Sequence, residues 1–176
     1  SQSQKVSVML GNSDGTFQVT INDSCFTGMQ DVVLADFNND TKTDAVVIGS
    51  TSNILMGDGT GHLIVQGSFN QGFFIGGEYF AVAGKFNSDN NYDLAIASNN
   101  SDSIAVLLGN GDFTFAAPVK YGVGDGPKNI EAYDMNGDTR LDLLVPNDLS
   151  NTVSILLGNA NGTFQSPQNV SVGNGP

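Results

Sequence analysis

The stretch "DMNGDTRLD", residues 134–142, decides how the rest of the chain is read. It places oxygen-bearing side chains at its positions 1, 3, 5 and 9. The same skeleton recurs as "DFNNDTKTD" at 36–44 and, with a lysine first, as "KFNSDNNYD" at 85–93, so that the copies start 49 residues apart. A constant spacing of this size is typical of repeat architectures, in which each copy forms one supersecondary unit.

Two further motifs recur in the same rhythm. One combines an apolar run with a glycine-rich turn: "VMLGNSDGTF" at 8–17, "ILMGDGTGHL" at 54–63, "VLLGNGDFTF" at 106–115 and "ILLGNANGTF" at 155–164. The other is a linker, "VGDGP" at 123–127 and "VGNGP" at 172–176, with the degenerate "IGGE" at 75–78. Every part of the chain therefore belongs to a repeat unit.

Each unit is predicted to form four short strands. The first enters the acidic loop, as "DVVLAD" at 31–36 does, and the second leaves it, as in "DAVVIGS" at 44–50. The third is of the type "VSILLG" at 153–158, and the fourth follows the turn, as in "TFQVTIN" at 16–22 and "TFQSPQNVSV" at 163–172. Such runs, bounded by Gly, Asn and Asp, indicate strands, and no sustained helical period occurs. Four antiparallel strands per unit make a β-propeller blade. An irregular β-sandwich is the alternative, but a sandwich needs no exact repeat.

The predicted architecture is all-β, with about three and a half four-stranded antiparallel blades of roughly 49 residues. A half blade of third and fourth strands occupies residues 1–28, and whole blades occupy 29–77, 78–126 and 127–176. Because closed propellers have about 4–8 blades, we do not expect the chain to close a ring by itself. The opening "SQSQ" lacks an initiator Met and a leader, which favours a processed or excised piece.

Composition narrows the classes of partner. The formal net charge is -12 with only 6 Lys and Arg, which argues against nucleic acid and against anionic membranes. Sixteen of the 18 acidic residues are aspartate, which favours turns and cation loops over helices. No apolar run approaches the ~20 residues that span a bilayer, so no membrane insertion is expected. The single cysteine, Cys25, excludes an internal disulfide; it is either buried and inert or free for an intermolecular bridge.

The acidic skeleton, the "LLGNxxGTF" motif and the "GxGP" linker together resemble the FG-GAP/VCBS repeat. That repeat is the blade of integrin α-subunit propellers and of many secreted microbial and invertebrate proteins. The resemblance covers essentially the whole chain. It implies a propeller blade with a calcium ion in the loop between its first two strands, and it decides no particular function.

The residues of two loops independently suit such an ion. Oxygens from positions 1, 3, 5 and 9, with the backbone carbonyl of position 7, can surround Ca²⁺ at about 2.3–2.6 Å. The expected ligands are Asp36, Asn38, Asp40, Lys42 (carbonyl) and Asp44 in one loop, and Asp134, Asn136, Asp138, Arg140 (carbonyl) and Asp142 in the other. An EF-hand would need glycine at position 6, glutamate at position 12 and flanking helices, and Mg²⁺ prefers fewer protein ligands. An Asx-turn cluster without metal remains the alternative.

The middle loop departs from the pattern at Lys85. We expect its ammonium to sit among Asn87, Asp89 and Asp93, with Asn91 at position 7, and to replace the ion by an internal Lys–Asp pair. Two calcium sites per chain and a metal-free middle loop follow. The alternative is that Lys85 points to solvent and the loop binds metal weakly.

No catalytic motif is found outside the repeat. His62 is the only histidine, no GxSxG occurs, and the repeated aspartates are explained by the loops, so the chain is not expected to be an enzyme.

Five sequons offer N-glycosylation in a eukaryotic secretory pathway: Asn22, Asn39, Asn99, Asn161 and Asn169. Asn22 and Asn169 share one repeat position on the fourth strand, where a glycan would obstruct edge-to-edge pairing. Asn39 lies inside a loop and is the least suited.

The sequence thus favours a secreted, extracellular, calcium-stabilised structural or adhesive glycoprotein module. Its expected partners are copies of itself or neighbouring repeats, in oligomers or filaments. The alternative is a lectin-like or integrin-like propeller that recognises a glycan or an extracellular protein. A third interpretation is a non-catalytic part of a larger secreted enzyme.

Overall fold

The computed structural model describes residues 4–25, 28–71 and 77–176. These residues form 14 strands and no helix, so the described chain holds no helix that could span a membrane. All pairings between the strands are antiparallel, and the strands form one two-stranded and three four-stranded sheets. The expectation of an all-β chain of propeller-type blades is confirmed.

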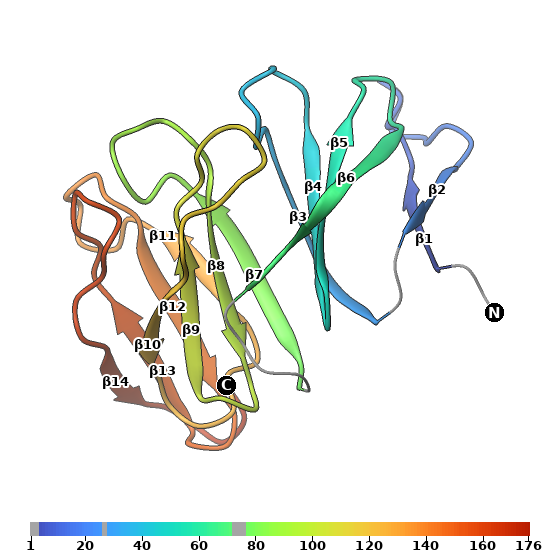
Figure 1. Ribbon diagram of the computed structural model, residues 1–176. Coiled ribbons are helices and arrows are strands. Elements are labelled where there is room, and N and C mark those ends of the chain that lie inside the picture. The colour runs from blue at the N-terminus through green and yellow to red at the C-terminus, as the bar shows by residue number, and fades with distance from the viewer. Residues whose placement is uncertain (1–3, 26–27, 72–76) are drawn as a thin grey trace.

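The sheets follow the chain in order (Figure 1). The half-blade consists of β1 (Gln4–Val8) and β2 (Ile21–Cys25). The first blade consists of β3 (Met29–Ala35), β4 (Asp44–Gly49), β5 (Ser52–Gly57) and β6 (Leu63–Phe69). The middle blade consists of β7 (Tyr79–Gly84), β8 (Asp93–Ser98), β9 (Ser103–Leu107) and β10 (Val119–Gly122). The third blade consists of β11 (Glu131–Tyr133), β12 (Asp142–Asn147), β13 (Thr152–Leu156) and β14 (Gln168–Ser171).

The hydrophobic core lies between the blades rather than within one of them. Successive strand residues point to opposite faces of a sheet, so each blade offers an apolar surface to both of its neighbours. In β8, Leu94 and Ile96 join the core shared with the first blade, whereas Ala95 and Ala97 join the core shared with the third. All six residues of β8 are buried, which explains its uninterrupted apolar run.

Aromatic residues after the glycine-rich turns join adjacent blades. The ring of Phe164 lies 5.4 Å from that of Phe86 and 5.9 Å from that of Tyr121, both on the middle blade. Phe115 makes the equivalent contact with Phe37 of the first blade, at 6.0 Å between centroids. Phe17 stands at the same repeat position in the half-blade, where its side chain is 65% exposed.

The fourth strands begin later than the sequence predicted. The prediction started them at residues 16 and 163, but β2 starts at Ile21 and β14 at Gln168. Phe17 and Phe164 instead form isolated bridges to Gly11 and Gly158. In the third blade Pro167 directly precedes β14, and proline cannot donate the hydrogen bond that would continue the ladder. Pro118 stands in the same place before β10.

Candidate cation-binding loops

The two intact loops have the same backbone frame, and the aspartate at position 1 organises it. Asp36 Oδ1 accepts the N–H of Asp40 at 3.0 Å and its Oδ2 accepts that of Thr41 at 2.8 Å. In the third blade Asp134 accepts the N–H groups of Asp138 and Thr139 at 3.1 and 2.8 Å. A carboxylate that accepts several N–H groups closes the loop around itself.

Positions 3 and 5 continue the pattern with side-chain oxygens bonded two residues ahead. Asn38 Oδ1 accepts the N–H of Asp40 at 3.0 Å, and Asp40 Oδ1 accepts that of Lys42 at 2.9 Å. Asn136 and Asp138 make the same two bonds in the third blade, each at 2.9 Å. The side chains at positions 1, 3 and 5 therefore all turn back onto their own loop.

Position 6 takes the left-handed conformation in all three loops. The φ angles of Thr41, Asn90 and Thr139 are 71°, 69° and 70°. A β-branched residue rarely adopts this conformation, so the loop hydrogen bonds must hold both threonines there. Glycine, the residue at position 6 of an EF-hand loop, would favour this conformation. The elements on either side are strands and not helices, however, so the loops are not EF-hands.

Position 9 carries a fully buried aspartate in every blade: Asp44, Asp93 and Asp142. Each accepts one N–H from position 2 of its own loop and one from the glycine at the end of the third strand or two residues beyond it. Asp44 accepts those of Phe37 and Gly57, both at 2.9 Å. Asp93 accepts those of Phe86 and Gly109 at 2.7 and 2.8 Å, and Asp142 those of Met135 and Gly158 at 3.0 and 2.9 Å. These aspartates bind each loop to the neighbouring turn.

Burial raises the pKa of Asp44 and of Asp93 above the usual value, because it disfavours the charged form more than the two N–H groups favour it. The sequence assigned position 9 to the metal and missed this backbone role. The signal was present in the middle loop, which keeps its position 9 aspartate although lysine occupies position 1.

Each intact loop also has its own cationic side chain at position 7. Lys42 Nζ lies 3.7 Å from Asp40 Oδ2, and the guanidinium of Arg140 pairs closely with Asp138. The pKa of Asp40 and that of Asp138 are lowered. The largest cause is the hydrogen bond from the backbone N–H of the position 7 residue, and the positive charge of the same residue contributes less. The sequence proposed only the carbonyls of these residues for the site.

The expected Lys85–Asp pair in the middle loop is wrong. Lys85 Nζ lies 5.1 Å from the centroid of the Tyr92 ring, a cation–π contact, and no ion pair joins it to Asp89 or Asp93 in the described part of the chain. Both aspartates already have partners: Asp89 accepts the Asn91 N–H and the Asn87 side-chain amide, and Asp93 accepts its two backbone N–H groups. The loop keeps the hydrogen bonds of positions 3, 5 and 9 without a carboxylate at position 1.

The fit of the intact loops to calcium rests on the side-chain oxygens at positions 1, 3 and 5. An ionised carboxylate has about four acceptor sites, so accepting an N–H leaves capacity for a metal. Across residues 4–25, 28–71 and 77–176, no group of three or more His, Cys, Asp or Glu side chains converges as in a closed metal site. Both carboxylate oxygens at position 9 accept backbone N–H groups, as both do at position 1. The two carboxylates, the amide oxygen and the carbonyl are oxygen ligands of the kind that a hard cation takes.

Two of the remaining candidate residues lie at the loops: Asn39 in the first loop, and Asn161, which forms an isolated β-bridge to Asn87 of the middle loop. Asn39 Nδ2, the atom to which a glycan would be attached, donates to Asn91 of the middle loop at 2.9 Å. Asn22 and Asn169 are exposed on β2 and β14 and accept hydroxyl bonds from Ser7 and Ser154. Asn99 bonds to Glu78, and Asn161 accepts bonds from Thr163. His62 lies 3.3 Å from Asp23, and the side chain of Cys25 falls outside the described residues.

Stacked four-stranded antiparallel blades, each with an acidic loop between its first two strands, define a propeller-type repeat protein. Residues 85–145 match the model of the FG-GAP-like repeat, which confirms the resemblance over that segment. No curated protein matches the chain in sequence.

A solved structure with a similar fold is a lectin of Agrocybe aegerita, described for its specific recognition of non-reducing terminal N-acetylglucosamine. The TM-score is 0.65 at 15% sequence identity, over 95% of this chain and 46% of that chain. The likeness shows a shared fold, and this chain spans about half of the lectin's length.

Proposed function

We propose that the chain is a calcium-stabilised, extracellular structural or adhesive repeat module. The observation that carries the proposal is the set of backbone hydrogen bonds that the first and third loops share, which brings side-chain oxygens from positions 1, 3 and 5 onto each loop. Calcium would be held by the side chains of positions 1, 3 and 5 and the carbonyl of position 7, with position 9 supporting the loop from behind. The middle loop, with lysine at position 1, would stay free of metal.

The bound ion would neutralise the carboxylates at the loop ends of the blades. The chain's own residues prepare this: the position 9 aspartates join each loop to the adjacent turn, and Asn39 joins the first loop to the middle loop. Ordering the loops therefore orders the surface between neighbouring blades. The net charge of -12 would favour uptake of the cation.

The second candidate is recognition of a glycan or an extracellular protein. The likeness of the fold to a lectin favours it. The absence of tryptophan weighs against aromatic sugar platforms. Glycosylation at Asn22 and Asn169 is compatible with either proposed function, since both side chains are exposed.

Light scattering and negative-stain microscopy of the purified chain, with calcium and then with chelator, would distinguish the structural module from the recognition module. Ordered assemblies that loosen on chelation support the structural module. A small monodisperse particle that binds a glycan array would favour recognition instead. A particle with the same size, melting temperature and binding in calcium and in chelator would contradict a calcium-stabilised module of either kind.

A further inference from the structure

Position 7 of the acidic loop connects the loop to the glycine-rich turn of the same blade. Its side chain differs between the blades, which carry Lys42, Asn91 and Arg140 there. Asn91 Nδ2 donates to the carbonyl of Gly109 at 3.2 Å, and Arg140 Nε donates to that of Gly158 at 3.0 Å. The first and third loops, for which we propose calcium, thus differ in the cation that they carry at this position.

In the third loop the guanidinium of Arg140 also occupies the carboxylate at position 5. Its Nη2 pairs closely with Asp138 Oδ2, and the same oxygen accepts Nδ2 of Asn136 at 2.9 Å. Asp138 Oδ1 accepts the backbone N–H of Arg140 at 2.9 Å. A carboxylate has about four acceptor sites, so these three bonds leave Asp138 little capacity for a metal. The side chain of Asp138 is 26% exposed, so solvent screens the pair only in part.

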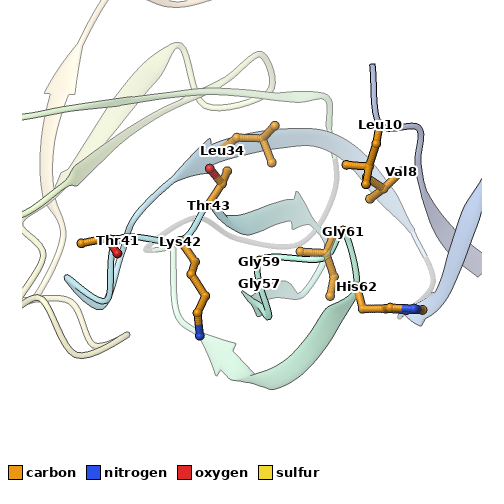
Figure 2. A pocket seen from close by; sticks show the side chains of 11 residues that line it. Val8, Leu10, Leu34, Thr41, Lys42, Thr43, Gly57, Gly59, Gly61 and His62 are labelled. Atoms are coloured by element: carbon orange, nitrogen blue, oxygen red, sulfur yellow. The ribbon is translucent and has the colours of Figure 1, made fainter. Parts of the chain in front are cut away.

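In the first loop the cation holds its aspartate less closely. Lys42 Nζ lies 3.7 Å from Asp40 Oδ2, which is beyond hydrogen-bonding distance. Figure 2 shows the Lys42 side chain extended beside the turn that carries Gly57 and Gly59. An ammonium on a flexible stem is a point charge, whereas a planar guanidinium can bond two acceptors at once. Lys42 can therefore move away from Asp40 more easily than Arg140 can leave its two partners.

We propose that Arg140 is an internal counter-ion of the third loop that competes with calcium, so that the first loop binds calcium more tightly than the third. The inference rests on the calcium sites proposed above. Both loops offer the same oxygens at positions 1, 3 and 5, so the difference lies at position 7. The guanidinium must leave Asp138 Oδ2 before that oxygen can accept a metal. If it stays, its charge lies beside the ion and repels it.

The two loops would then fill in sequence as the calcium concentration rises, and both would be filled at saturation. Without calcium, Arg140 joins Asp138 to the carbonyl of Gly158, so the chain's own cation holds the third loop against its turn. In a chain with one ion bound, the first loop would carry the ion and the third loop would still be held by Arg140.

Isothermal titration calorimetry on two single-loop variants tests the order of affinity. Asp134→Asn leaves the first loop and Asp36→Asn leaves the third. The dissociation constant of the third loop should be about threefold to tenfold higher, the size expected for one partly exposed ion pair with its hydrogen bonds. Adding Arg140→Gln to Asp36→Asn should remove most of that difference. Adding Lys5→Gln instead, which removes one positive charge from the half-blade, is the control and should change the constant by less than about twofold.

The conservative variant separates the guanidinium contact from its charge. Arg140→Lys in the Asp36→Asn chain places the residue of the first loop in the third. Its dissociation constant should lie within about twofold of that of the first loop. This variant keeps the net charge and the stem, so it tests the proposal even if Arg140→Gln fails to fold.

Thermal unfolding in chelator gives a readout that involves no metal. Arg140→Gln should lower the melting temperature there by a few degrees, because Asp138 and the Gly158 carbonyl lose a partner, and by less in saturating calcium. Equal dissociation constants for the two loops, or no gain in affinity with either Arg140 variant, would overturn the counter-ion and leave the calcium module standing. No heat of calcium binding with either single-loop variant would overturn both proposals.

Discussion

At the scale of single residues, the buried aspartate at position 9 is the most consistent feature of the molecule. Asp44, Asp93 and Asp142 make the same two backbone contacts although their loops differ at position 1. The sequence predicted the positions of these carboxylates and their repetition. It could not predict that they bind the neighbouring turn, because the glycine partner lies 13 to 16 residues ahead and is brought near only by strand pairing.

Replacing Asp93 by asparagine tests this role where no metal is expected. The amide has one acceptor oxygen, so its NH₂ group would face either the Phe86 N–H or the Gly109 N–H. A buried donor without an acceptor costs about 1–3 kcal/mol. We expect Asp93→Asn to lower the free energy of unfolding by that amount in urea denaturation. Asp89→Asn, at an exposed position of the same loop, is the control and should change it by about 0.5 kcal/mol or less.

The pH dependence of stability follows from pKa values that folding shifts in opposite directions at different aspartates. Burial raises the pKa of Asp93, so the folded chain takes up that proton before the unfolded chain does as the pH falls. Hydrogen bonds from Thr16 and Thr114 lower the pKa of Asp14 and of Asp112 below 3.8, so there the unfolded chain takes up the proton first. In chelator, the free energy of unfolding should rise slightly as the pH falls from 7 towards 4, and drop below 3.8. A monotonic fall from pH 7, measured by urea denaturation, would contradict the shift at Asp93.

At the scale of elements, periodicity predicted the type, order and number of the strands. Boundaries were less predictable at the fourth strand, because the phenylalanine after the turn looks like the start of a strand. Its ring instead packs on the preceding blade, and the ladder begins only after Pro118 or Pro167. The position of Lys85 was also missed, since the sequence does not show that the loop acceptors are already used.

Phe164 and Phe17 provide a matched pair at one repeat position. Phe164 is 6% exposed and contacts two rings of the middle blade, whereas Phe17 is 65% exposed. Phe164→Ala should destabilise the chain by about 3–5 kcal/mol, as for other buried phenylalanines. Phe17→Ala should cost about 0.5 kcal/mol or less. Similar losses for both variants in urea denaturation would show that Phe17 is covered in solution.

At the scale of the whole molecule, the blades form a series in which each blade buries apolar side chains against its neighbour. The sequence predicted this series from the 49-residue spacing alone, together with the half-blade at its start. It did not predict the exposure of Val32 and Leu34, because that exposure depends on which strands stand opposite them. The match to an FG-GAP-like repeat and the fold of the similar lectin agree with the series.

Bound calcium per chain, counted by elemental analysis after dialysis, tests the central claim most directly. The parent chain should hold two ions, and Asp36→Asn or Asp134→Asn should each leave one. Lys85→Asp restores an acidic position 1 in a loop that already has the frame, so it should hold three. Calcium should raise the melting temperature in the same order. Three ions in the parent chain, none, or a count unchanged by Lys85→Asp would contradict the assignment of the loops.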